Sequence, residues 1–280
     1  MSGRHVMEAL GLSRVTVVDG KVVDVTEPRL RYCPMFSKMG LVQDITAESV
    51  RKNIEFRIRD FGLFTENRVV RAGDAVTFGV SEILSLAMRN GLLDAACIVS
   101  DGCGSAVITD PELLQGLCGR ISGIIETSPL NVVLDEVGDD NVLDPEAVPI
   151  DQRAIAAEAS SRGYGRFAVT VSDPDEALAM RWLYGDQAVI VGVHTSGCRN
   201  TDRFFEACDI ITACASGNIR RKAYALREEG KCMIAGNKVQ IVAVTDIGIR
   251  LVGDKLESLG KKFWDGRSEP EDPVPLFYHQ

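Results

Sequence analysis

Residues 167–193 read FAVTVSDPDEALAMRWLYGDQAVIVGV, and this stretch decides the fold. An apolar run at 167–171 is followed by a helical pattern at 174–184 and by a second apolar run at 188–193. Continuous apolar runs are typical of strands buried on both faces, and a helix between two such strands is typical of a parallel crossover. The stretch therefore predicts a βαβ unit within a mostly parallel sheet.

The same alternation of helical and apolar patterns extends on both sides of this unit. The further predicted strands are 95–99, 210–213 and 239–244, and the further predicted helices are 81–90, 152–162, 201–207, 218–229 and 247–259. Strands that alternate with helices favour a sheet covered by helices on both faces. We therefore expect an α/β fold with a mostly parallel sheet and flanking helices, in a Rossmann-like arrangement of three layers.

A different pattern precedes the α/β part. Asp19-Gly20 separates two apolar segments at 15–18 and 21–25, which predicts a β-hairpin with a two-residue turn. Thr46 is a candidate N-cap for a helix that would end at Gly62. The sequence therefore predicts an N-terminal hairpin and helix ahead of the sheet.

These patterns divide the chain into four segments. We expect an N-terminal region at 1–77, a first α/β lobe at 78–148, a second at 149–263 and a Pro-rich tail at 264–280. Between Arg120 and Arg153 the chain carries eight acidic residues and no basic one. The favoured interpretation of that stretch is a solvated connection between the lobes, and the alternative is a divalent-cation site, although its spacing fits no calcium loop.

The composition excludes several classes of protein. The chain has 280 residues, with 31 Lys and Arg against 40 Asp and Glu, a net charge of −9. This balance argues against nucleic-acid binding and an anionic-membrane surface, unless a local basic patch exists. No apolar run approaches the roughly 20 residues of a membrane span, and no secretory signal is visible, so we expect no membrane insertion and a cytoplasmic location. There is no P-loop motif and no GxSxG motif.

The eight cysteines are expected to be free thiols, because a chain of this size builds its own core. No CxxC pair occurs and the chain has three histidines, so no zinc-finger spacing can be written. A ligand set drawn from distant segments stays open. For each cysteine taken singly, the favoured alternative is that it is a small buried apolar residue.

The predicted parallel strands would end at one common edge, where ligands of open α/β sheets bind. The residues that follow these strands are Ser100, Asp101, Gly102, Cys103, Gly104 and Ser105; Ser172 and Asp173; His194, Thr195, Ser196, Gly197 and Cys198; Cys214, Ala215, Ser216 and Gly217; and Thr245 and Asp246. Ser172, Asp173, Thr245 and Asp246 are better explained as helix caps. His194 is a candidate general base or ligand, and a structural role for it is equally favoured.

Cations near a helix N-terminus suggest an anionic ligand. Arg220, Arg221 and Lys222 begin the predicted helix after Cys214, where the helix dipole disfavours positive charge. Residues 194–231 contain seven basic and five acidic side chains, a net of +2. Such a positive edge would favour the thiolate of Cys214 or Cys198. The alternative is that the cations point into water or pair with Asp202, Glu206 or Asp209. Cys208 would lie at the opposite end of the strand from Cys214.

Several strings resemble one known family. They are HVMEALG at 5–11, YCP at 32–34, RKNIEFR at 51–57, TDPEL at 109–113 and CDIITACAS at 208–216. Over nearly the whole chain, to about residue 259, the sequence is similar to methanogenesis marker protein 8. The resemblance implies an archaeal methanogen, an anaerobic cytoplasm and a tie to methane metabolism. It implies no particular reaction and no catalytic residue.

These observations give one leading hypothesis: an accessory enzyme or maturation factor of methanogenesis that binds an anionic small molecule or cofactor. Cys214, with Cys33, would supply the thiolate, and Asp101 and His194 would handle protons. Arg220 and Arg221 would hold the anion. The remaining candidate ligand-binding residues are Gly102, Gly104, Ser105, Thr195 and Ser216.

Two alternatives stay open. The first is an iron–sulfur protein with ligands drawn from Cys33, Cys103, Cys198 and Cys214, which an anaerobic setting favours. The second is a non-enzymatic scaffold that docks on a larger methanogenic complex through the hairpin and the acidic face. Either reading is compatible with a homo-oligomer.

Overall fold

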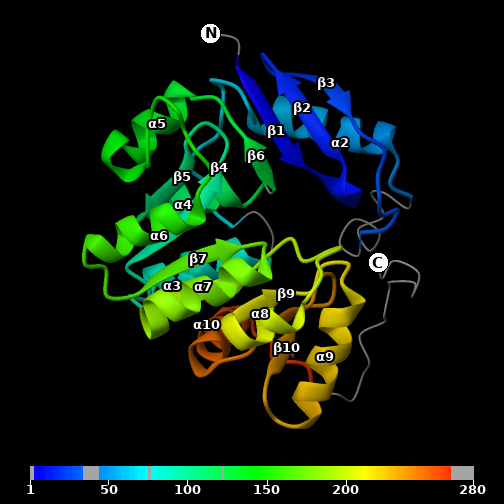
Figure 1. The fold of residues 1–280 in the computed structure, drawn as a ribbon, viewed down its shortest axis with the longest axis vertical. Helices are drawn as coiled ribbons and strands as arrows, with labels where there is room; N and C mark the ends of the chain where they lie inside the picture. The colour runs from blue at the N-terminus through cyan, green and yellow to red at the C-terminus, as the bar shows by residue number, and fades with distance from the viewer. Residues whose placement is uncertain (1–2, 34–43, 75–76, 122, 266–280) are drawn as a thin grey trace. The chain divides into compact units, whose positions relative to one another are not determined.

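The computed structural model describes residues 3–33, 44–74, 77–121 and 123–265 (Figure 1). The chain divides into two compact units. Unit 1 contains residues 1–31, 44–76 and 95–164, and unit 2 contains residues 32–43, 77–94 and 165–280. The N-terminal region thus shares a unit with most of the predicted first lobe, whereas the predicted helix at 81–90 is grouped with the second.

Unit 1 contains a four-stranded antiparallel sheet among its described residues, in the order β3-β2-β1-β6 (Figure 1). The strands are β1 (Arg4–Glu8), β2 (Arg14–Val18), β3 (Lys21–Val25) and β6 (Ile124–Glu126). The predicted hairpin is confirmed, with Asp19 and Gly20 at φ values of 48° and 72° as a two-residue turn requires. Strand β1 was not predicted.

Helix α2 (Ala47–Phe61) has the predicted ends. The Thr46 hydroxyl accepts a hydrogen bond from the Ser49 amide, and the Ser49 hydroxyl closes the capping box on the Thr46 amide. The helix ends at Gly62, whose φ of 67° is the left-handed conformation that favours glycine. Val50 and Ile54 form its buried face.

The rest of unit 1 contains a hairpin that was not predicted. Strands β4 (Ala95–Ser100) and β5 (Gly104–Ile108) pair antiparallel, so the turn after β4 leads into a strand and not into a helix. The helices of this part are α4 (Pro111–Cys118), α5 (Asn131–Val137) and α6 (Gln152–Ser161), with short 3-10 turns at Leu10–Leu12 and Asp139–Asn141.

The acidic stretch between Arg120 and Arg153 is not a connection between lobes, and that expectation was wrong. It contains β6, which pairs with β1, and α5, and it lies within unit 1. Val133, Leu134 and Val137 are buried on α5, whereas Asp135 and Glu136 are exposed. The apolar face folds the segment, and the acidic side chains occupy its outer face.

Unit 2 is built on the predicted βαβ pattern. Strands β7 (Phe167–Val171), β8 (Ala188–Gly192) and β9 (Ile210–Thr212) pair in parallel, with Val171 opposite Gly192 and Gly192 opposite Ile211. A short 3-10 turn at Gly185–Gln187 precedes β8. The helices of the unit are α3 (Val80–Arg89), α7 (Pro174–Tyr184), α8 (Asp202–Ala207), α9 (Gly217–Glu228) and α10 (Asp246–Ser258). Helices α7 and α8 pack together, as do α3 and α10 (Figure 1).

The described strands of unit 2 lie in the order β10-β11-β9-β8-β7. The predicted α/β class, with a parallel sheet core, flanking helices and an N-terminal hairpin, is confirmed. Strands β10 (Met233–Ala235) and β11 (Ile241–Ala243) pair antiparallel, and β11 also runs antiparallel to β9. The sheet of unit 2 is therefore parallel across β7, β8 and β9 and antiparallel at β11 and β10.

The direction of β11 corrects one expectation. Thr245 and Asp246 follow β11 and so lie at the opposite edge from the residues that follow β8 and β9. There the Thr245 hydroxyl donates to Asp209 Oδ1 at 2.7 Å and caps α10 by accepting from the Gly248 amide. Asp173 likewise caps α7, so the capping interpretation holds for both residues.

Within the described part of the chain, no helix is both long enough and apolar enough to cross a bilayer.

Candidate functional site

The carboxyl ends of β7, β8 and β9 bring three loops of unit 2 together. We call these residues the strand-end edge: Ser172, residues 194–198 and residues 212–216. The Cys198 thiol donates to the Ser172 carbonyl, with Sγ 3.5 Å from the oxygen. The Thr195 hydroxyl donates to the Thr212 carbonyl at 2.6 Å. The strand-end edge therefore forms as the parallel strands predicted.

Cys214 occupies a strained turn between β9 and α9. The Ser216 amide donates to the Ala213 carbonyl at 2.8 Å, which makes residues 213–216 a tight turn with Cys214 as its second residue. Cys214 has a φ of 43°, a conformation that favours glycine, and Ala215 does not share it. A side chain held in the left-handed region costs on the order of 1–3 kcal/mol and often marks a functional position.

Two groups contact Cys214 directly. Thr212 Oγ1 lies 3.4 Å from the Cys214 Sγ and 3.2 Å from the Gly192 carbonyl, to which it donates. The buried Arg220 side chain donates from Nη1 to the Cys214 carbonyl at 3.4 Å. The half-buried Cys214 therefore has a cation bonded to its carbonyl and, beside its thiol, a hydroxyl that can reorient toward the sulfur.

Hydroxyl groups join two of the three loops of the strand-end edge, residues 194–198 and residues 212–216. The Ser196 Oγ accepts a hydrogen bond from the Ala215 amide at 2.9 Å. Ser216 is the N-cap of α9 and accepts from the Ile219 amide at 3.4 Å. Ser216 and Thr195, two predicted ligand-binding residues, thus lie on the strand-end edge together with Cys214.

His194 lies at the end of β8 with a φ of 53°, again an unusual value for a residue other than glycine. The residue as a whole is partly exposed, and burial of its imidazole lowers the pKa of His194 to about 4. The imidazole is therefore neutral at pH 7. In that state it can accept a hydrogen bond or bind a ligand, but it cannot serve as a proton donor of ordinary strength.

The cations of this region divide into two groups. Lys222 pairs with Asp202 at 2.8 Å, and Arg203 forms an ion pair with Asp175. Arg221 is exposed and contacts the Asn218 side chain. Ion pairing, the alternative considered from sequence, therefore accounts for Lys222, whereas Arg220 is buried under the Cys214 turn.

Cys208 lies before β9 and Cys214 after it, so the two thiols lie at opposite ends of this strand, as predicted. Cys208 is buried, and burial raises the pKa of its thiol. Cys208 is therefore a core residue and not part of the strand-end edge.

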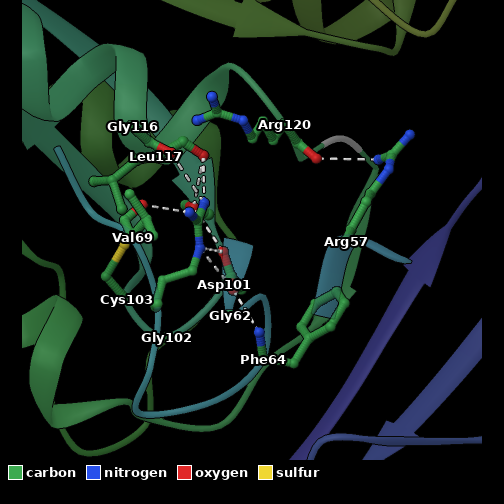
Figure 2. Close-up of polar contacts among 12 residues, drawn as sticks. Arg57, Gly62, Phe64, Val69, Asp101, Gly102, Cys103, Gly116, Leu117 and Arg120 are labelled. Atoms are coloured by element: carbon green, nitrogen blue, oxygen red, sulfur yellow. Dashed lines mark hydrogen bonds and ion pairs between the residues drawn. The ribbon is translucent and has the colours of Figure 1, made fainter. Parts of the chain in front are cut away.

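Asp101, the predicted proton-transfer residue of unit 1, is fully buried in an ion pair (Figure 2). Arg68 Nε lies 3.1 Å from Asp101 Oδ1, and the Phe64 amide donates to Oδ2 at 2.8 Å. The Arg68 Nη atoms donate to the carbonyls of Val69, Gly116 and Leu117. The Arg68–Asp101 pair thus holds together three segments of unit 1, at 64–69, at 101 and at 116–117.

Residues 102–105, which follow Asp101, also make their contacts inside unit 1. Gly102 and Gly104 have φ values of 85° and 60°, and a Cβ on Gly104 would lie 2.2 Å from the Val148 carbonyl oxygen. The buried Ser105 hydroxyl accepts from the Asp151 amide at 2.8 Å. Burial raises the pKa of the Cys103 thiol. Steric and hydrogen-bonding requirements of the β4–β5 turn therefore explain these residue types.

The predicted cysteine ligand set is not assembled in the described part of the chain. Among those residues no three His, Cys, Asp or Glu side chains lie close enough to hold one metal ion. Cys33 is half-buried and belongs to unit 2, whereas Cys103 belongs to the core of unit 1.

Sequence reasoning missed Arg68 and Thr212. The Arg68 side chain is entirely buried, and no local pattern distinguishes it from the exposed arginines nearby. Thr212 is the last residue of a strand, and its contact with Cys214 depends on the conformation of the turn. A signal was available for Thr212, because a hydroxyl two positions before a strand-end cysteine is close enough to contact it.

Comparisons with known proteins agree with the archaeal origin implied by the resemblance. Residues 5–257 match the model of a family described as "Uncharacterized protein conserved in archaea (DUF2099)". A protein of Methanocaldococcus jannaschii, named "Uncharacterized protein MJ0054", is 42% identical over 263 residues, which cover 92% of each chain. No solved structure matches the chain.

Proposed function

Because the chain belongs to this family of proteins conserved in archaea, we propose that it is an accessory enzyme or maturation factor of methanogenesis that binds an anionic small molecule or cofactor at the strand-end edge. The methanogen relative and the resemblance to methanogenesis marker protein 8 support the metabolic context. An anaerobic cytoplasm, in which thiols persist, is the location that fits this role.

One observation carries the proposal: Cys214 is held in a glycine-like conformation between β9 and α9. A strand, a tight turn and a helix present the turn residue at the open edge of an α/β sheet, where a nucleophile is accessible. The conformation of the turn does not require a cysteine there, because glycine would adopt the positive φ at lower cost. We therefore assign the role of position 214 to its thiol.

The surroundings of Cys214 favour an anionic ligand. The α9 N-terminus presents backbone amides and a partial positive charge, and Arg220 lies beneath the turn. The exposed Arg221 is available at the rim. The neutral His194 at the end of the adjacent strand would accept a proton from a ligand only when an anion stabilises the imidazolium.

The proposed site does not include Asp101 or the β4–β5 turn, because the Asp101 carboxylate is already hydrogen-bonded to Phe64 and Arg68 of unit 1. The proposed chemistry therefore involves only residues of the strand-end edge and of α9. Cys214 supplies a thiolate, Arg220 and Arg221 attract the anion, and Thr195, Ser196 and Ser216 fix the two loops. The site's substrate is defined by class, an electrophile or cofactor that carries negative charge.

Two alkylating agents that differ in charge test the proposal. Iodoacetate is anionic and iodoacetamide is neutral, and both form an S–C bond with a thiolate and release iodide. The reduced full-length protein is labelled anaerobically, and each cysteine is quantified by peptide mass spectrometry. We expect Cys214 to favour iodoacetate over iodoacetamide about tenfold more than the half-buried Cys118 does.

Matched variants locate the charge. Arg220→Gln removes the cation beneath Cys214, whereas Arg227→Gln removes a cation at the other end of α9, where Arg227 lies 4.3 Å from the Trp264 ring centre. The preference for iodoacetate should fall in the first variant and persist in the second. Equal labelling of Cys214 and Cys118 by both reagents would refute an anion site at the strand-end edge.

A further inference from the structure

His5 is a buried titratable group that the proposed function does not use. It lies on β1, and its side chain is entirely buried. Its Nδ1 is 2.8 Å from Thr127 Oγ1 and accepts from the Ser128 amide at 3.4 Å. The ring packs against Phe64 with a centroid separation of 5.1 Å. The imidazole therefore joins β1 to two other segments of unit 1, residues 127–128 and the loop that contains Phe64.

Thr127 links this imidazole to the β4–β5 turn. Its Oγ1 accepts a hydrogen bond from the Gly102 amide at 2.9 Å, so the hydroxyl proton is free to be donated. That proton goes to His5 Nδ1 or to the Ser128 carbonyl, which is 3.3 Å away. The shorter distance favours His5, which is consistent with Nδ1 acting as the acceptor of a neutral ring.

The same turn is tied to Phe64 from the other side. Asp101 precedes Gly102 and accepts from the Phe64 amide at 2.8 Å. Phe64 has a φ of 64°, a strained value for an aromatic residue, and its ring covers the imidazole. His5, Thr127, Gly102, Asp101 and Phe64 thus form a closed set of contacts within unit 1.

The charged groups around His5 are already paired. Asp101 and Glu126 both attract a proton to the ring, from the β4–β5 turn and from β6. The Asp101 carboxylate, however, is bound to Arg68, and Glu126 forms an ion pair with Arg4 on the same strand as His5. On β2, the residue opposite His5 is Val17. The two carboxylates that attract a proton to His5 are therefore both bound to arginines.

From this geometry we infer that His5 is an acid-sensitive latch, which holds β1 and the end of β6 to the β4–β5 turn while it is neutral and releases them when it is protonated. Protonation puts a hydrogen on Nδ1, so that the Ser128 N–H loses its acceptor and faces another donor, and the hydrogen bond with Thr127 is reversed, its hydroxyl turning to the Ser128 carbonyl. It also places a positive charge in a fully buried position. Both changes oppose the closed contacts.

Proton binding by His5 determines the direction in which the opening equilibrium changes with pH. Burial, the largest cause, lowers the pKa of His5 below its usual 6.5, against the smaller attraction of Asp101 and Glu126. Below pH 6.5 the unfolded chain binds a proton that the closed unit excludes. The opening equilibrium should therefore increase by up to about tenfold per pH unit as the pH falls below 6.5.

Hydrogen exchange on the full chain tests the latch. We expect the opening constants of the Gly102 and Ser128 amides, corrected for intrinsic exchange, to rise as the pH falls from 7.5 to 5. Amides of β8 in unit 2 provide the internal reference. His5→Gln cannot titrate in this range and should remove the rise, whereas His279→Gln, at a position outside the described residues, should leave it unchanged.

Several results would contradict the latch. An equal rise in wild type and His5→Gln would overturn the latch, as would wild-type opening constants at Gly102 and Ser128 that do not change with pH. If His5→Gln fails to fold, NMR titration of the wild-type His5 ring decides the matter. A ring that titrates at or above pH 6.5 in the folded protein would also overturn it.

Discussion

Arg68 and Asp101 form an ion pair in which both side chains are completely buried, with Arg68 Nε 3.1 Å from Asp101 Oδ1. Every contact of the carboxylate lies inside unit 1, and Arg68 also donates to three backbone carbonyls. A buried ion pair of this kind adds little to the free energy of unfolding compared with apolar packing of the same volume. Removing one partner, however, leaves an uncompensated charge in the core. Asp101 thus has a structural role that its sequence position alone did not indicate.

Asp101→Asn should destabilise the protein by about 3–5 kcal/mol, because Arg68 would remain charged and buried without its partner. Urea unfolding at pH 7 measures the change. The exposed pair Arg59–Asp60 is the matched control, and Asp60→Asn should cost under about 1 kcal/mol. The double variant Arg68→Met with Asp101→Leu should recover part of the loss. A small effect of Asp101→Asn would contradict the assignment of a committed, buried carboxylate.

Cys214→Gly should be more stable than Cys214→Ala by about 1 kcal/mol, because glycine adopts the positive φ of this position without steric cost. Ala215→Gly is the matched control in the same turn. Since Ala215 does not have a positive φ, its replacement should destabilise the protein by roughly 0.5–1 kcal/mol. Thermal unfolding of the three variants gives the comparison. Equal stabilities for Cys214→Gly and Cys214→Ala would mean that the turn is not strained.

Gly104→Ala should destabilise unit 1 by more than about 1 kcal/mol, since its Cβ would lie 2.2 Å from the Val148 carbonyl oxygen at a φ of 60°. Gly91→Ala provides a control at a similar φ of 68° with no heavy atom within 4 Å of the added carbon. Denaturation of both variants separates the steric clash from the conformational cost. A Gly104→Ala protein as stable as Gly91→Ala would restore the case for a ligand-binding glycine at this position.

The free energy of unfolding should depend on His194 in acid. The folded-state pKa of His194 is lowered to about 4, whereas the unfolded value is near 6.5. Between these values the unfolded chain binds a proton that the folded chain does not, so the contribution present above pH 6.5 is lost as the pH falls toward 4. The slope of stability against pH in this window should be smaller for His194→Gln than for wild type. An NMR titration midpoint of the His194 ring near 6.5 would contradict the burial of the imidazole.

The local elements were largely accessible from sequence. Asp19-Gly20 fixed the hairpin and Thr46 with Gly62 fixed the ends of α2, because turn and cap conformations depend on neighbouring residues. The alternating pattern of 167–193 predicted β7, α7 and β8 almost to the residue. At the strand-end edge, parallel pairing of β7, β8 and β9 places the loops after β8 and β9 side by side, with Thr195 bonded to Thr212 and Ser196 to Ala215.

Local sequence specifies the βαβ core and the loops that meet at its strand ends, since apolar periodicity and helix caps are local properties. Tertiary structure alone decided the direction of β11, because a short apolar strand has the same composition whichever way it runs. It likewise decided that Asp101 belongs to Arg68, a partner 33 residues away. Pairing between distant residues is set by chain packing, and no local pattern encodes it.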